Sequence, residues 1–181
     1  NSATRYNQSN FRSNGDGDVT DYLSIRFDVS GRLEDRNFPT QGAGDTFRML
    51  MRGKPNLPAF WPDGTPGPDI EYGQNPVVTG TDATGYNNDE RYFLQGNLGL
   101  DLAVPGVDGL EIRGNAAYDK DFRSQKVWQT PWTLYTWDYQ TYDENGEPVL
   151  IPGQRGYSEP RISRRHEDGS DILLNLVADY R

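Results

Sequence analysis

LSIRFDVSGRLE, residues 23–34, alternates strictly between two kinds of side chain. Its odd-numbered positions are apolar or glycine, and its even-numbered positions are all polar or charged. Successive side chains of a β-strand point to opposite faces of the sheet. A period of two over these residues therefore predicts a strand with one apolar face and one polar face.

The same alternation recurs in three later segments. We expect strands near residues 22–34, 91–102, 110–119 and 170–180. Strands of soluble sandwiches usually have about 5–6 residues, whereas a strand that crosses a bilayer at about 45° needs about 9–11. The lengths of the predicted strands therefore favour a membrane-spanning sheet.

The connections between these strands are of two kinds. A short Pro/Gly turn, residues 103–109, joins the second strand to the third, whereas residues 35–90 and 120–169 form long loops. Short turns that alternate with long external loops are typical of outer-membrane barrels, and long loops are uncommon in compact soluble domains. We expect an all-β fold, namely a segment of a large transmembrane antiparallel β-barrel with long extracellular loops.

The predicted hairpin also suggests where aromatic side chains gather. If Leu102 pairs with Leu110, Tyr92 and Tyr118 lie on one face at nearly the same height. Such a row is typical of the aromatic girdle of a membrane barrel. The alternative is the general preference of tyrosine for strands.

Composition excludes several classes of function. The chain has 27 acidic and 18 basic residues, no cysteine, and His166 as its single histidine. Disulfides, thiolate metal sites and histidine clusters are therefore not expected, and a net charge of −9 argues against nucleic acid. The apolar runs are too short for a spanning helix or a signal peptide. We expect no enzyme activity, no catalytic residue, no metal and no cofactor.

Several motifs in a fixed order resemble one family. They are Pro58–Thr65 (PAFWPDGT), Asn75–Val77 (NPV), Val104–Ile112 (VPGVDGLEI), Ala117–Asp119 (AYD), and Lys126–Trp128 followed by Pro131 and Leu134–Tyr135. Their order and spacing resemble the middle of the barrel in SusC/RagA-type TonB-dependent outer-membrane transporters of Bacteroidetes. The resemblance covers most of the chain from about Asp21 onward.

The resemblance implies a function in nutrient uptake. Such transporters have a barrel of about 22 strands closed by an N-terminal plug. A SusD-like surface lipoprotein covers them, and TonB acts through the plug region. Their substrates are glycans, oligosaccharides or peptides. Residues 1–181 would then be a partial barrel without the plug domain, placed in the lipid bilayer of the bacterial outer membrane, where they supply barrel wall and external loops.

Aromatic residues in the long loops are the candidate contact residues. Aromatic faces pack well against sugar rings and apolar peptide groups, which makes them frequent at binding surfaces. The residues predicted to touch substrate or partner are Trp61, Trp128, Trp132, Tyr135 and Trp137. The alternative is a loop folded around its own aromatic core, or an extension of the girdle.

Other interpretations of the sequence remain open. A secreted soluble all-β module could bind glycan through Trp128, Trp132 and Trp137. A glycoside hydrolase would need two carboxylates about 5–10 Å apart. The alternating oxygens of residues 14–20 partly resemble a calcium loop, although a simple turn is the expected structure there. On the polar strand faces, Arg26, Arg32 and Arg113 are expected to pair with carboxylates such as Asp28 and Asp101.

Overall fold

The computed structural model describes residues 3–181 and shows an all-β protein. About 60% of the chain is strand and 9% is helix, and the sheet is mostly antiparallel, which confirms the predicted class. The elements are β1 (Arg5–Thr20), β2 (Leu23–Phe38), α1 (Ala43–Arg52), α2 (Pro76–Thr79), a 3-10 turn η1 (Asp82–Thr84), β3 (Gly85–Ala103), β4 (Leu110–Gln129), β5 (Trp132–Thr136), β6 (Ile151–Arg155) and β7 (Arg161–Tyr180).

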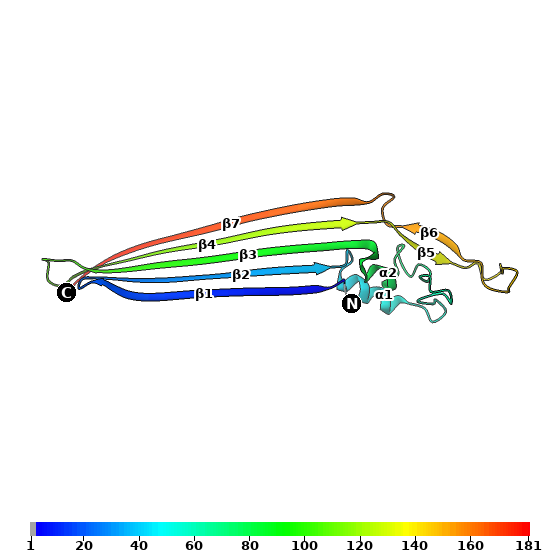
Figure 1. Ribbon diagram of the computed structural model, residues 1–181, viewed down its shortest axis with the longest axis horizontal. Coiled ribbons are helices and arrows are strands. Elements are labelled where there is room, and N and C mark those ends of the chain that lie inside the picture. The colour runs from blue at the N-terminus through cyan, green and yellow to red at the C-terminus, as the bar shows by residue number, and fades with distance from the viewer. Residues whose placement is uncertain (1–2) are drawn as a thin grey trace. The chain divides into compact units, whose positions relative to one another are not determined.

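Five long strands form one sheet in the order β1-β2-β3-β4-β7 (Figure 1). Strands β5 and β6 form a separate antiparallel pair in which Trp132 lies opposite Arg155 and Thr136 opposite Ile151. Within residues 3–181 the five-stranded sheet is open, with β1 and β7 at its edges. The all-β class is thus established, and closure into a barrel is not part of the described structure.

The strands are longer than the alternating patterns from which they were predicted. β2 has 16 residues, β3 has 19, and β4 and β7 have 20 each. The predicted loops at residues 35–90 and 120–169 are shortened accordingly. Polar residues occupy both faces near these strand ends, for example at Asp35–Asn37 and Asn87–Glu90. The hydrophobic pattern therefore ends before the backbone pairing does.

Strand β1 was not predicted, and the turn expected at residues 14–20 is wrong. Those residues lie within β1, which is exposed almost throughout. Its sequence has few apolar residues, so it gives no alternating signal. Cross-strand contacts hold it to β2 instead: Arg12 donates to Asp28 at 2.6 Å, and the Ser24 hydroxyl bonds Asp18.

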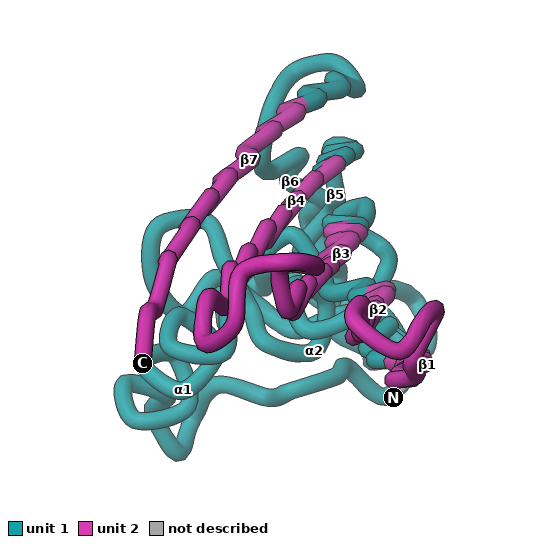
Figure 2. The backbone as a smooth tube through the Cα atoms, turned by 90° about the vertical axis from the view of Figure 1, so that its left-hand side faces the viewer, with its two compact units in different colours: residues 1–6, 36–88, 125–164 teal, residues 7–35, 89–124, 165–181 magenta. Residues whose placement is uncertain are grey.

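The chain divides into two compact units (Figure 2). In the described residues, unit 1 comprises residues 3–6, 36–88 and 125–164, with both helices and the β5-β6 pair. This unit has an ordinary core. Its buried apolar residues are Ala3, Met49, Trp61, Val78 and Leu134.

Unit 2 comprises residues 7–35, 89–124 and 165–181, and consists of portions of the five long strands with their turns. Among the described residues, none of its apolar side chains is buried. Leu98 is 44% exposed and Leu174 is 75% exposed, whereas Glu34 and Asp89 are buried. No helix in residues 3–181 is long and apolar enough to span a membrane. The burial pattern of unit 2 is thus the reverse of a soluble core.

Contacts between strands assign the two faces of unit 2. Arg26 donates to Asp101 at 2.7 Å, as predicted, and Arg113 donates to Asp179 at 3.1 Å. We call the face that carries these residues the polar face, and the opposite face the apolar face. Because side chains alternate, the apolar face of β3 carries Leu94 and Leu98. The predicted two-faced strands are confirmed.

Candidate functional site

A row of alternating charges crosses the polar face of β3, β4 and β7. We call it the charged ladder, and its members in order are Arg91, Asp89, Arg123, Glu167 and Arg165. Arg123 donates from Nε to Asp89 Oδ1 at 2.6 Å and from Nη2 to Oδ2 at 3.1 Å. Its Nη1 reaches Glu167 at 3.0 Å. One guanidinium thus joins three strands.

Asp89 is the least exposed member of the charged ladder, with a side chain 9% exposed. Arg91 adds a contact from Nη2 to Asp89 Oδ2 at 3.1 Å, so two guanidinium groups surround this carboxylate. A buried carboxylate is tolerated when it is paired and hydrogen-bonded. The ladder therefore fixes the relative positions of three neighbouring strands.

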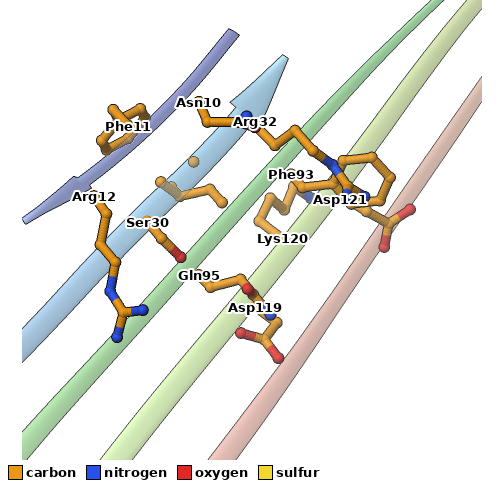
Figure 3. Close-up of a pocket in the computed structure, with 12 residues that line it drawn as sticks. Asn10, Phe11, Arg12, Ser30, Arg32, Phe93, Gln95, Asp119, Lys120 and Asp121 are labelled. Atoms are coloured by element: carbon orange, nitrogen blue, oxygen red, sulfur yellow. The ribbon is translucent and has the colours of Figure 1, made fainter. Parts of the chain in front are cut away.

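A groove of about 470 Å³ lies across β1, β2, β3 and β4 within unit 2. Figure 3 shows side chains from two rows across these strands. The residues of one row are Arg12, Ser30, Gln95 and Asp119, and those of the other are Asn10, Arg32, Phe93 and Asp121. Phe11, Gly31, Leu94 and Lys120, each between two of these residues in the sequence, complete the lining. The row residues on β2, β3 and β4 are an even number of positions from a residue of the polar face on their own strand, and Arg12 of β1 pairs with Asp28 of that face. We therefore call this hollow the polar-face groove.

Charged side chains of both signs line the groove. Arg12 and Arg32 have side chains that are 70% and 46% exposed, and they form ion pairs with Asp28 and Glu34 respectively. The Arg32 guanidinium also lies 4.3 Å from the centre of the Phe93 ring.

The two aspartates of the groove, Asp119 and Asp121, are both exposed. Within the described residues, neither has a basic side chain at ion-pair distance. The Asp121 carboxylate lies over Gly169, where an added Cβ would meet Oδ1 at 2.3 Å and force it to move. Glycine at this position of β7 therefore leaves room for the Asp121 side chain.

The apolar face carries an aromatic row of Tyr92, Phe122 and His166. The Tyr92 and Phe122 ring centres are 5.9 Å apart, and Phe122 stacks on His166 at 6.1 Å. The expected partner of Tyr92 in this row was Tyr118, and Phe122 takes that place. At the turn between β3 and β4, the Val104 amide donates to the Leu110 carbonyl at 2.9 Å. Leu110 therefore pairs with Val104, and the expected pairing of Leu110 with Leu102 is wrong.

Two of the predicted contact residues are joined in unit 1. The Trp61 indole nitrogen donates to the Tyr135 carbonyl at 2.9 Å, and Trp61 is only 9% exposed. Leu134, next to Tyr135, is fully buried. Trp61 therefore belongs mainly to the core of this unit, which agrees with the alternative of a loop folded around its own aromatic side chains.

The remaining three predicted residues lie in different surroundings. Trp137 packs against Tyr139 and Tyr142, with ring centres 5.0 and 5.1 Å apart, and its indole nitrogen donates to Thr141. Trp132 begins β5, and its ring fills the space beside Gly156, where φ is +79°. Trp128 lies on β4. The structure thus places these residues in separate settings, and their contact with a substrate or partner stays a prediction.

A cleft of about 420 Å³ in unit 1 is lined by Trp61, Pro62, Asp63, Asp143, Glu147, Pro148 and Leu150. Two of its carboxylates are tied into turns. The Thr65 hydroxyl and amide lower the pKa of Asp63, and the Glu147 amide lowers the pKa of Asp143. In residues 3–181, no group of three or more acidic or histidine side chains has the geometry to hold a metal.

No protein-family model matches the chain, and no curated protein matches it either. The site is therefore defined by its geometry. Sequence reasoning missed the polar-face groove because Asn10 and Arg12 lie on the unpredicted strand β1. One signal was present, since alternation places the aromatic residue Phe93 on a polar face.

Proposed function

We propose that this chain forms part of the wall and the external loops of a TonB-dependent outer-membrane importer of the SusC/RagA type. Its cargo would be glycans, oligosaccharides or peptides. The motif order in the sequence supports the family, and the burial pattern of unit 2 supports the membrane. Plug domain, TonB and a SusD-like lipoprotein belong to the proposal as partners.

The single observation that supports it best is the reversed burial of unit 2. Its apolar side chains are exposed, with Leu94 at 42%, Leu98 at 44% and Ile172 at 70%, while Asp89 on the polar face is buried. Soluble monomers rarely expose apolar patches larger than a few hundred Å². Lipid tails would cover the apolar face, and a water-filled lumen would solvate the polar one.

The length of the strands and the open edges of the sheet also support a place in a membrane barrel. Each long strand has 16 to 20 residues, more than the roughly 9–11 that cross a bilayer, so the ends would extend beyond the lipid. An open edge in lipid leaves backbone groups unpaired at a cost of several kcal/mol each. The proposal therefore includes further strands that pair with β1 and β7.

Membrane fractionation with detergent extraction tests the proposal. We expect the intact protein in the outer-membrane fraction, soluble only with detergent, and its unboiled form to migrate differently from its boiled form in a denaturing gel. A folded monomer that stays in solution without detergent would overturn the proposal. That result would favour the soluble glycan-binding alternative, which binding of oligosaccharides by wild type and by Trp137→Ala would then examine.

A further inference from the structure

We infer that helix α1 of unit 1 binds to an anionic lipid surface and lies along it, with one apolar side of the helix in the lipid. We call this side the α1 stripe, and its members are Phe47, Leu50 and Met51. The inference goes beyond the proposed function, which assigns the bilayer to the apolar face of unit 2. It adds a second membrane contact, made by a helix.

The first support is the exposure of the α1 stripe. Its residues stand at positions i, i+3 and i+4, which lie on one side of a helix. Phe47 is 65% exposed, Leu50 is 63% exposed and Met51 is 72% exposed. The buried residue of α1 is Met49, outside the stripe. The helix thus presents large apolar side chains to its surroundings, where a surface helix normally presents polar ones.

The second support is that other contacts fix the rotation of the helix. Arg48 and Arg52 both pair with Glu71, and the Arg48 contact joins Nε to Glu71 Oε2 at 3.4 Å. Arg48 also pairs with Asp45 at 3.1 Å. With 3.6 residues per turn, these charges and the fully buried Met49 lie outside the stripe. Turning the stripe inward would break the contacts, so its exposure is a property of the folded unit.

The third support is the charge of the segment. Residues 43–54 have a net charge of +2, and adding the charge of Glu71 leaves +1. By contrast, residues 55–90 carry six acids and no lysine or arginine, and the whole chain has a net charge of −9. Lys54 follows the helix directly and has no ion-pair partner in the part of the chain that the structure describes. Anionic headgroups are the surface that complements a basic amphipathic helix.

The size and shape of the α1 stripe favour lipid over a protein partner. A stable protein interface buries about 800 Å² on each side and involves roughly 20–30 residues. The stripe supplies three large side chains that project from a single short helix. Such a ridge needs no matching pocket in a lipid surface, where headgroups and chains rearrange around it. Amphipathic helices with basic residues bind anionic membranes in this way.

Tyr72 adds an aromatic residue beside the helix. It is 78% exposed, and its ring centre lies 5.9 Å from the Arg48 guanidinium. Its φ is +51°, which is uncommon for a residue other than glycine. The Asp69 carboxylate holds this turn by accepting from the Gly73 amide at 2.9 Å. With an apolar ring and a polar hydroxyl, an exposed tyrosine suits the boundary between lipid and water.

The test uses the absence of cysteine from the chain, which allows one fluorescent label at a chosen position. Met51→Cys places the fluorophore NBD on the α1 stripe, and Asp45→Cys places it on the other side of the same helix. Each intact labelled protein is reconstituted into vesicles of equimolar phosphatidylcholine and phosphatidylglycerol with nitroxide-bearing lipids. We expect the label at position 51 to shift its emission to shorter wavelengths and to be quenched, and the label at position 45 to do neither.

Two variants examine the apolar and the charged parts of the contact. F47S/L50S should remove most of the quenching at position 51. Ile151→Ser is the matched control, since it replaces another exposed apolar residue of unit 1, on β6, and should leave the quenching unchanged. Lys54→Gln should weaken the quenching more in the vesicles with phosphatidylglycerol than in vesicles of phosphatidylcholine alone, and high salt should act in the same direction.

Three outcomes would overturn the inference. They are no quenching at position 51, equal quenching at positions 51 and 45, and cross-linking of two copies through position 51 without quenching. The last result would assign the stripe to a contact with a second copy of the chain.

The same label at Leu98→Cys judges the proposed function separately. Quenching at position 98 without quenching at position 51 retains the proposed function and removes the inference about α1. A protein that is soluble without detergent loses the proposed function. The labelled protein is then added to the same vesicles, and quenching at position 51 but not at position 45 still supports the binding of α1 to lipid.

Discussion

Arg123 holds Asp89 through two nitrogens, with Nε 2.6 Å from Oδ1 and Nη2 3.1 Å from Oδ2, and so links β4 to β3. This bidentate geometry is the strongest form of an arginine–carboxylate contact. Because the Asp89 side chain is 9% exposed and that of Asp101 is 33% exposed, the Arg123–Asp89 pair is better shielded from water than the pair of Arg26 with Asp101 on the same face.

Replacing Asp89 with Asn should therefore destabilise unit 2. We expect a loss of about 1.5–3 kcal/mol in the free energy of unfolding, because charge-assisted bonds to two arginines disappear. Urea unfolding in detergent micelles measures it. Asp101→Asn is the matched control, and since Asp101 is 33% exposed, its loss should be only about 0.2–1 kcal/mol. Equal losses at the two positions would contradict the role given to Asp89.

Neighbouring positions on β3 test the two faces directly. Leu98→Arg should cost about 2–4 kcal/mol if this residue lies near the bilayer midplane, because it places a charge among lipid tails. Asn97→Arg should cost far less, since Asn97 lines a hollow on the polar face together with Arg26 and Asn115. Unfolding from lipid vesicles gives both values, and similar costs would count against the assigned faces.

The ring of Phe11 on β1 occupies the space beside Gly31 on β2. A Cβ added to Gly31 would lie 2.0 Å from Phe11 Cε1, so the ring must move. We predict that Gly31→Ala destabilises the wild type but has little effect in a Phe11→Ala background. A double-mutant cycle on the free energy of unfolding measures the coupling. Additive effects would show that the ring and the glycine act independently.

The hydrogen bond from Trp61 to the Tyr135 carbonyl predicts how Trp61→Phe changes the stability of unit 1. Trp61→Phe retains an aromatic ring but removes the donor, so unit 1 should lose about 0.5–1.5 kcal/mol. Trp137→Phe removes a similar bond to Thr141 from a more exposed segment and should cost less. Thermal unfolding of both variants compares them, and a larger loss for Trp137→Phe would disagree with the placement of Trp61 in the core.

The stability of the loop around Asp138 should depend on pH. The Thr141 hydroxyl, followed by the Thr141 and Gln140 amides, lowers the pKa of the Asp138 carboxyl below its ordinary value of 3.8. A carboxyl with a lowered pKa stabilises the folded loop fully above the ordinary value, and this contribution is lost as the pH falls through the lowered value. Exchange of the Gln140 and Thr141 amides, corrected for the intrinsic rate, should therefore accelerate at the lowest pH. In Asp138→Asn this acceleration should vanish, and its persistence would mean that another group controls the loop.

Much of the sheet was predictable, whereas the site was not. The strict alternation at residues 23–34 and 92–102 gave strand, face and approximate position, and Arg26 has the partner expected for it. Strand ends were underestimated where both faces are polar, and β1 was missed because it is an edge strand with almost no apolar residue. The aromatic residues Trp61 and Trp137 were found by residue type, but residue type does not distinguish a core position from an exposed one.

The sequence by itself determined which side chains share a face, because a strand has a fixed period of two and that period survives any arrangement of the strands. Only the tertiary structure decided which strands are neighbours, and hence that Arg12 and Asp119, far apart in the chain, line one groove. The physical reason is that strand order and register depend on hydrogen bonds and side-chain contacts between distant segments, such as the bonds of Arg123 to Asp89 and Glu167, and no local pattern encodes them.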